Sequence, residues 1–229
     1  MSLAHRAIAE EQMDAADLDP ATYAAILTDL AQVNRLTLAY RPTIGFVARA
    51  IGARRRFRLL DVGFGDGDML RQIARWAARR GIDAELVGID LNPRSAPVAR
   101  AATDPALRID YRTGDYRDLA GGEFDLVVSS LVAHHMGEAE LVDFLRFMEA
   151  EAALGWMVND LHRHALAHAG YPLLARLLRW HRIVREDGTL SIARSFRPAE
   201  WRPLLAAAGI TDARVVRRFP FRLCVERTR

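Results

Sequence analysis

Residues 59–70 read LLDVGFGDGDML, an apolar run followed by glycine at every second position. The glycines are Gly63, Gly65 and Gly67, and Asp61 stands two residues before the first of them. Glycine weakens strands and helices, so three in one turn indicate that another molecule or another part of the chain approaches the backbone closely. An apolar strand that leads through such a loop into an amphipathic helix is typical of α/β domains that bind a ligand at the helix N-terminus.

From residue 58 onward, short apolar runs alternate with amphipathic stretches. Strands are expected at 58–63, 84–90, 107–115, 123–130 and 154–160, with helices at 68–81, 92–103 and 137–153. This alternation predicts a parallel sheet built with right-handed crossovers. A helix at 197–209 precedes two further strands, and these must be antiparallel because only Pro220 separates them. We therefore predict an α/β fold with a seven-stranded, mostly parallel sheet that ends in an antiparallel hairpin.

Two segments lie outside this alternation. Residues 1–52 are expected to be helical throughout, and residues 162–197 form a long connection with an inserted helix that starts at Pro172. We interpret both segments as helical cover over the carboxyl edge of the sheet. The chain is then one domain, made of an N-terminal helical lid (1–52), a cofactor-binding core (53–161), an inserted helical cap (162–197) and a C-terminal helix with the hairpin (198–229).

The composition is that of a globular protein, with 51% hydrophobic and 27% charged residues. No run approaches the roughly 20 apolar residues of a membrane span, and the N-terminus lacks the apolar segment of a secretory signal. Cys224 is the single cysteine, so we expect a cytoplasmic protein without disulfides. All 32 basic residues are arginine, which raises the pI to about 9.5 although the net charge is only +3, so the pI alone does not indicate a nucleic-acid binder.

The spacing of the glycines distinguishes two classes of enzyme. The dinucleotide fingerprint Gly-x-Gly-x-x-Gly would require a glycine at Asp68, so a nicotinamide oxidoreductase is disfavoured. The sequence Asp61-x-Gly63-x-Gly65-x-Gly67 matches in full the first motif of the class I S-adenosylmethionine-dependent methyltransferases. Residues 58–160 and the terminal hairpin resemble this family. The resemblance implies a Rossmann-like fold and S-adenosylmethionine as the cofactor.

The resemblance also implies which residues hold the cofactor, because acids stand at the ends of three successive expected strands. Asp61 would help to hold its amino group, Asp90 would accept both ribose hydroxyls, and Asp115 would bind the adenine amino group. The full set of implied cofactor-binding residues is Asp61, Gly63, Phe64, Gly65, Gly67, Asp90, Leu91, Asp115, Tyr116 and Ser129.

Histidines and other polar residues follow the fourth and fifth expected strands, at the edge where such sheets bind ligands. The candidate general bases are His134 and His135 after the fourth strand and His162 after the fifth, since an imidazole titrates near neutral pH. A single histidine in such a place can equally be a cap or a packing residue, so the choice among the three stays open. The candidate substrate-binding residues are Asn159, Asp160, Arg163 and Tyr171.

Several features that are missing from the sequence limit the classes of molecule that could accept the methyl group. Catechol-type methyltransferases hold Mg²⁺ with a carboxylate after the fourth strand and an Asp-Asn pair after the fifth. Here Ser129 replaces that carboxylate and the pair is the reversed Asn159-Asp160, so no metal is predicted. The Pro-Pro-aromatic motif of nucleobase N-methyltransferases is absent after the fourth strand, and Cys224 lies in the last strand rather than where a C5-methylating nucleophile is needed. We therefore predict no nucleic-acid partner.

The segments SSLVAHHM (129–136) and VNDLHRH (158–164) are similar to small-molecule methyltransferases related to the quinone-biosynthesis group, some of which act on phenols, quinols or polyketides. This similarity predicts methyl transfer to a small aromatic hydroxyl compound, with O-methylation favoured over C-methylation because histidines are available as bases. An RNA or protein methyltransferase and a non-catalytic S-adenosylmethionine-binding module are the alternatives. A monomer or a homodimer is expected.

Overall fold

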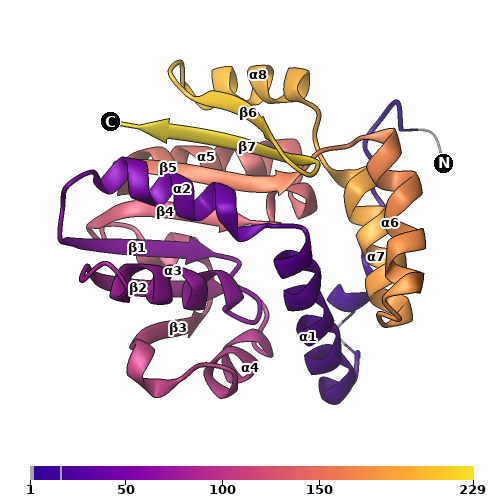
Figure 1. Ribbon diagram of the computed structural model, residues 1–229. Coiled ribbons are helices and arrows are strands. Elements are labelled where there is room, and N and C mark those ends of the chain that lie inside the picture. The colour runs from indigo at the N-terminus through magenta and orange to yellow at the C-terminus, as the bar shows by residue number, and fades with distance from the viewer. Residues whose placement is uncertain (1–2, 16) are drawn as a thin grey trace.

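The computed structural model describes residues 3–15 and 17–229, and within them seven strands form one sheet in the order β3-β2-β1-β4-β5-β7-β6 (Figure 1). The strands are β1 (Arg56–Val62), β2 (Asp83–Asp90), β3 (Ile109–Thr113), β4 (Phe124–Ser130), β5 (Ala152–Leu161), β6 (Arg214–Arg218) and β7 (Arg222–Thr228). Neighbours from β3 to β5 pair in parallel, whereas β7 is antiparallel to both β5 and β6. The predicted mostly parallel sheet with a terminal hairpin is confirmed.

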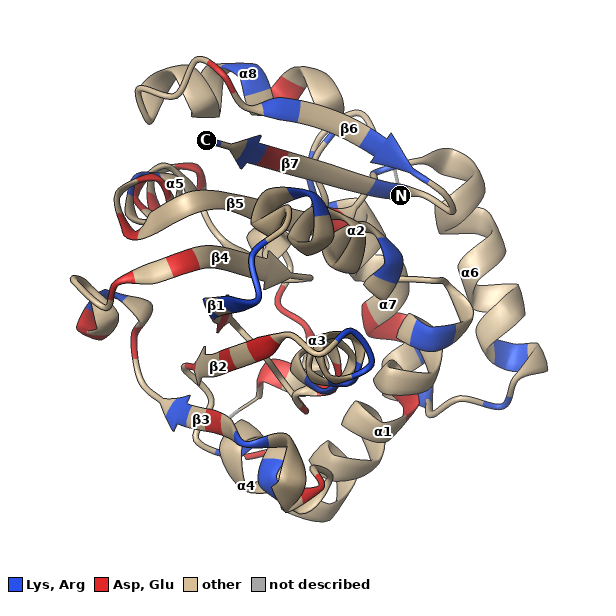
Figure 2. Ribbon diagram, turned by 60° about the vertical axis from the view of Figure 1, so that its left-hand side comes forward, with Lys and Arg blue, Asp and Glu red and all other residues tan. Residues whose placement is uncertain are grey.

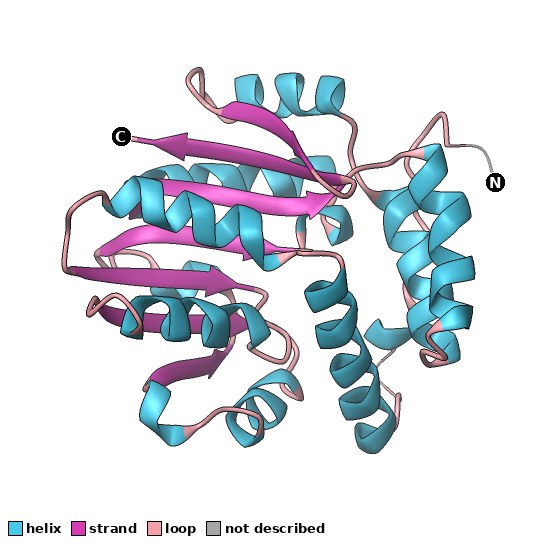
Figure 3. Ribbon diagram, in the orientation of Figure 1, coloured by secondary structure: helices cyan, strands magenta, loops and turns pink. Residues whose placement is uncertain are grey.

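Helices cover both faces of the sheet and its carboxyl edge (Figure 3). One face carries α2 (Tyr40–Ile51), α3 (Asp68–Ala78) and α4 (Ser95–Ala101), and the other carries α5 (Glu138–Glu151) and α8 (Pro198–Ala207). Beyond the ends of the parallel strands lie α1 (Pro20–Leu36), α6 (Ala165–Leu177) and α7 (Arg182–Arg194), at the right of Figure 1. The short 3₁₀ turns are η1 (Gln12–Asp14), η2 (Pro105–Leu107), η3 (Tyr116–Leu119) and η4 (Ala133–His135).

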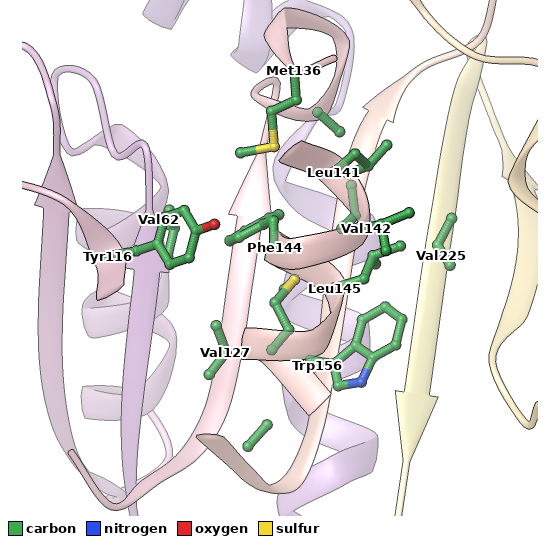
Figure 4. Close-up of a cluster of buried hydrophobic side chains, with 14 of the residues drawn as sticks. Val62, Tyr116, Val127, Met136, Leu141, Val142, Phe144, Leu145, Trp156 and Val225 are labelled. Carbon is green, nitrogen blue, oxygen red and sulfur yellow. The ribbon is translucent and has the colours of Figure 1, made fainter. Parts of the chain in front are cut away.

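The core follows the alternation of side chains along the strands. In β4, Val127 packs in the cluster under α5 and α8, while Leu126 and Val128 pack under α2 and α3. Figure 4 shows Phe144 and Leu145 of α5 lying against side chains from the strands. The two clusters fix the sheet between its helical layers, so the carboxyl ends of β1, β2 and β4 are held at one edge.

Two details of the expected helical cover were wrong. Residues 3–11 form no helix: the chain runs irregularly along α7, where Ala7 N donates to Ala193 O at 3.0 Å. We call residues 3–15 the strap. The insertion after β5 holds two helices, and Pro172 lies inside α6, which begins at Ala165 because the side chain of His164 caps it. The expected lid 1–52 also includes residues 1, 2 and 16, which lie outside the described residues.

Basic and acidic residues are interspersed over the elements of the fold (Figure 2). Some of them pair at the surface, as Arg58 does with Glu85 at 2.9 Å and Arg112 with Asp110 at 2.7 Å. In the part of the chain that the structure describes, no helix combines the length and the apolar character needed to cross a bilayer.

Gly155, where β5 pairs with β7, provides a test of the strand packing. Its φ is +152°, and an added Cβ would lie 2.3 Å from the backbone oxygen of Arg227. We expect Gly155→Ala to lower the free energy of unfolding by about 1–3 kcal/mol, because the β7 backbone would have to shift. The control Gly45→Ala, inside α2 with ordinary contacts, should raise it by about 0.5–1 kcal/mol. Urea unfolding of both variants measures this, and an equal effect of the two changes would contradict the steric explanation.

Candidate functional site

A cavity of about 420 Å³ lies beyond the carboxyl ends of the parallel strands. Its walls come from the glycine loop, the ends of β2 and β3, the loop after β4, helix α1 and the strap. Gly67 and Ser129 lie outside this lining, and the Ser129 hydroxyl donates to Val62 O at 2.9 Å instead. The other implied cofactor-binding residues all line the cavity, namely Asp61, Gly63, Phe64, Gly65, Asp90, Leu91, Asp115 and Tyr116.

The glycine loop is shaped by close packing at one position and leaves space at another. Gly63 has φ +75°, and an added Cβ would lie 2.3 Å from Cγ2 of Val132. Gly65 has φ +57°, and the nearest atom to its added Cβ would be Cδ2 of Leu27 at 4.0 Å. Both positions require the left-handed backbone that glycine adopts without strain. At Gly65 the backbone is therefore open to a molecule in the cavity.

Asp61 is a buried acid, and one of its oxygens has no partner among the described residues. Its side chain is almost fully enclosed, and its Oδ1 accepts no hydrogen bond from the described residues. Burial, together with the nearby carboxylates of Asp68 and Asp90, raises the pKa of Asp61 well above its usual value. A buried polar atom without a partner is costly, so its place in a cavity wall suits a ligand that brings a hydrogen-bond donor or a positive charge.

Asp90 and Asp115 stand at the same wall, each held by backbone amides. The two oxygens of Asp90 accept from Gly65 N at 2.9 Å and Asn92 N at 2.8 Å. Burial raises the pKa of Asp90, although these two bonds oppose the shift. Asp115 accepts from the backbone and side chain of Arg117, both at 2.9 Å. Carboxylate oxygens have further lone pairs, so both acids can still accept from ligand hydroxyl or amino groups.

His134 is buried between two carboxylates. Its Nδ1 lies 2.8 Å from Oδ1 of Asp160, its backbone N donates to Oδ2 of Asp160 at 2.9 Å, and its Nε2 lies 3.5 Å from Oε1 of Glu11. Burial disfavours the imidazolium, but the two acids outweigh it and raise the pKa of His134 to about 9. The same contacts lower the pKa of both Glu11 and Asp160 against the effect of their burial. At neutral pH the ring is therefore protonated on both nitrogens, with Nδ1 donating to Asp160 and Nε2 facing the carboxylate of Glu11.

His135 is the more accessible of the two neighbours, with 30% of its side chain exposed. Its Nδ1 lies 3.2 Å from Oδ2 of Asp14, and its Nε2 lies 3.8 Å from Oε2 of Glu11, beyond hydrogen-bonding distance. The rings of His134 and His135 are 4.2 Å apart, and both residues line the cavity.

The remaining sequence candidates lie elsewhere. His162 lines neither this cavity nor the second one described below, and burial together with Arg217 lowers its pKa. Asn159 is buried and ties β5 to α2 by donating to Ala39 O at 2.8 Å and to the Thr43 hydroxyl at 3.0 Å. Arg163 is buried and donates to Leu3 O at 3.1 Å, to Ser195 O at 2.8 Å and to the carboxylate of Glu200. These contacts make Asn159 and Arg163 anchors between parts of the fold.

A second, largely apolar cavity of about 260 Å³ adjoins the first. It lies among α1, α6, α7 and the hairpin, and Leu161, Tyr171 and Ile192 are among its walls. Tyr171 donates its hydroxyl to Val184 O at 3.0 Å, and burial raises its pKa. The two cavities share the lining residues Leu30, Asn34, Leu131 and Ser191, so they lie next to each other.

Sequence reasoning missed the acids of the strap. Glu11 and Asp14 meet the two histidines, yet no periodicity or motif marks them, because their neighbours in the fold are far away in the chain. Among the described residues, Glu11, His134 and His135 also bring ligand atoms within 4.8 Å of one another, a spacing that a divalent transition metal can bridge. Mutual ion pairing of these groups accounts for the same spacing.

The raised pKa of His134 predicts a specific dependence of stability on pH. The folded protein holds this proton up to about pH 9, against about 6.5 in the unfolded chain, so the stabilisation is complete below pH 6.5 and is lost as the pH rises through about 9. Thermal denaturation should show a melting temperature that falls across this interval in the wild type. The His134→Gln variant should lack that part of the fall, whereas His5→Gln, at an exposed position, should retain it. Identical pH profiles for wild type and His134→Gln would contradict the assignment.

Comparison with known proteins agrees with this geometry. A methyltransferase domain family matches residues 59–151. The ubiquinone biosynthesis O-methyltransferase of Azorhizobium caulinodans is 35% identical over 105 residues, which cover 44% of this chain and 38% of that relative. The aligned part of the chain therefore spans well under half the length of this curated relative.

Two solved structures share the fold. Human N-acetylserotonin methyltransferase, in complex with S-adenosylmethionine, superposes with a TM-score of 0.64 at 16% identity, covering 92% of this chain and 56% of that one. An S-adenosylmethionine-dependent methyltransferase of Aquifex aeolicus superposes with a TM-score of 0.61 at 18% identity, covering 92% of this chain and 98% of that one. With the motif of the glycine loop and the strand order, these findings show that residues 59–151 match a methyltransferase domain and that the chain has the fold of S-adenosylmethionine-dependent methyltransferases.

Proposed function

We propose that this protein transfers a methyl group from S-adenosylmethionine to the oxygen of a small phenolic or quinol-type acceptor. The observation that carries the proposal is the pair of adjoining cavities, one walled by acids and the glycine loop and the other by apolar side chains. Such a pair suits a charged cofactor beside an apolar acceptor. The similarity to O-methyltransferases of ubiquinone biosynthesis supports the same class of acceptor.

The residues of the first cavity fit S-adenosylmethionine. The unpartnered oxygen of buried Asp61 offers an acceptor for an ammonium group, and the space at Gly65 leaves room for a ligand against the backbone. Asp90 and Asp115 would hold the ribose hydroxyls and the adenine amino group. When bound, the cofactor supplies an electrophilic methyl group on a positively charged sulfur. The acidic wall favours such a cation by Coulomb attraction.

The two adjacent histidines have different roles in this proposal. His134 is held as a buried cation and serves to position the loop after β4. His135 is the general base: Asp14 holds its Nδ1, which leaves Nε2 to take the proton of an acceptor hydroxyl. Because a phenol is a far weaker nucleophile than its phenolate, removing this proton can contribute roughly 10²–10⁴ in rate. Holding the acceptor in line with the methyl group contributes further through orientation.

Cofactor binding is the first test. We expect micromolar binding of S-adenosylhomocysteine to the wild type by calorimetry, and a loss of about 10–100-fold in Asp90→Asn, since a hydrogen bond to a charged group contributes about 1.5–3 kcal/mol. Asp110→Asn, which changes an exposed acid outside the cavity, is the matched control and should bind normally. If the wild type does not bind, the proposed function is wrong.

Turnover tests the assignment of the base. With a labelled methyl donor and a panel of phenols and quinols, we expect His135→Gln to lower turnover by about 10²–10⁴-fold while the affinity for S-adenosylhomocysteine is retained. His168→Gln, on α6 and outside both cavities, is the control. Full turnover in His135→Gln combined with loss in His162→Gln would move the base to His162. Binding of the cofactor without methylation of any acceptor would favour the non-catalytic binding module, and methylation of RNA or protein alone would favour those substrates.

A further inference from the structure

Arg222, the first residue of β7, is a buried cation without an anionic partner. Only 2% of the residue is exposed, and no carboxylate of the described residues lies within 4.0 Å of its guanidinium. Its Nη1 is enclosed and has no hydrogen-bond acceptor among those residues. Its Nη2 has one distant acceptor, Oδ1 of Asn34 at 3.5 Å. Burying a guanidinium in this state costs free energy, because its hydration is lost and no carboxylate is in direct contact with it.

The nearest acids are already engaged with other groups. Asp160 accepts from the backbone and ring of His134 and from Leu161 N. Oδ2 of Asp68 accepts from Asn34 at 2.9 Å and from Tyr40 at 2.8 Å. Neither carboxylate makes a direct ion pair with the guanidinium of Arg222, although both attract its charge from a longer distance.

Arg222 also stands at the junction of the two cavities. It lines the apolar second cavity, and Asn34, the residue that its Nη2 contacts, lines both cavities. Figure 1 shows that β7 begins at the edge of the sheet where α6 lies. Most of the other lining residues are apolar, such as Leu131, Leu161 and Phe221, and the remainder are uncharged polar residues. A molecule in this cavity would therefore meet one buried cation in a largely apolar surrounding without other charged groups among the described lining residues.

We propose that Arg222 binds a carboxylate of the acceptor, so that the acceptor is a hydroxylated aromatic acid with an apolar substituent. That the bound acid is the methyl acceptor rests on the proposed function. Its binding to Arg222 does not depend on that function. The anion is a group other than the reacting oxygen, because His135 lines only the first cavity and Arg222 only the second. A guanidinium and a carboxylate match in planar geometry and form strong charge-assisted hydrogen bonds. The carboxylate would thus supply the acceptors that Nη1 lacks.

A matched pair of probes tests the carboxylate directly. We would measure by calorimetry the affinity of the wild type for 2-hexyl-4-hydroxybenzoate and for 3-hexylphenol, which is the same molecule without the carboxylate, each in the presence of S-adenosylhomocysteine. We expect the acid to bind at least tenfold more tightly at pH 7.5. Equal affinities, or a preference for the neutral phenol, would overturn the proposal.

Variants separate a binding role of Arg222 from a structural one. In Arg222→Met the preference for the acid should disappear, the affinity for 3-hexylphenol should persist, and the melting temperature should not fall, because an unpaired buried charge is removed. Arg222→Lys should retain part of the preference. The control Arg217→Met, which removes an exposed arginine from the neighbouring strand, should behave as the wild type does. A lower melting temperature in Arg222→Met with the preference for the acid intact would show that Arg222 is structural.

Failure of the proposed carboxylate site can be distinguished from failure of the proposed function. If the wild type binds no S-adenosylhomocysteine but still prefers the acid in an Arg222-dependent way, the methyl-transfer proposal fails and the carboxylate site stands. If S-adenosylhomocysteine binds and phenols are methylated without any preference for the acid, the methyl-transfer proposal stands and the carboxylate site fails. Should Arg222→Met not fold, the comparison of the two probes on the wild type still decides.

Discussion

The site depends on one buried carboxylate, that of Asp160 in β5. It accepts hydrogen bonds from the backbone and ring of His134 and from the amide of Leu161, which fixes the loop after β4 against the neighbouring strand. His134 in turn faces Glu11 of the strap, and Glu11 accepts a hydrogen bond from Ser191 of α7 at 2.8 Å. One chain of charged and polar groups thus joins the sheet, the loop, the strap and the inserted helices around the cavity.

The charged groups in this series stabilise one another as buried ion pairs do. Each carboxylate lowers the cost of burying the imidazolium, and the imidazolium does the same for each carboxylate, so the groups are stable only together. Removing one partner from such a set typically costs about 3–5 kcal/mol, because a charge is left uncompensated. The strap contains no α-helix, and the contacts of Glu11 and Asp14 with the two histidines help to hold it in place.

The two cavities differ in the charge of the side chains that line them. The first has Asp61 and Asp90 in its wall, and carboxylates favour a positively charged ligand. The second is apolar and contains the single buried guanidinium of Arg222 among its described lining residues. Residues such as Asn34 and Leu131 belong to both walls, so the two cavities are neighbours. This arrangement suits the proposed methyl transfer, because donor and acceptor must be held close together in a fixed orientation.

The sequence by itself determined the sheet and the acid-lined wall of the site. Asp61, Asp90 and Asp115 could be placed together because parallel strands bring their carboxyl ends to one edge, and the glycine spacing marks the loop beside them. Only the tertiary structure decided the rest. In the folded protein His134 is buried between carboxylates, whereas His135 is partly exposed. Asn159 and Arg163 make structural contacts between parts of the fold. Glu11 and Arg222 line the cavities. These roles depend on which distant side chains become neighbours on folding, and local pattern and spacing carry no information about such long-range contacts.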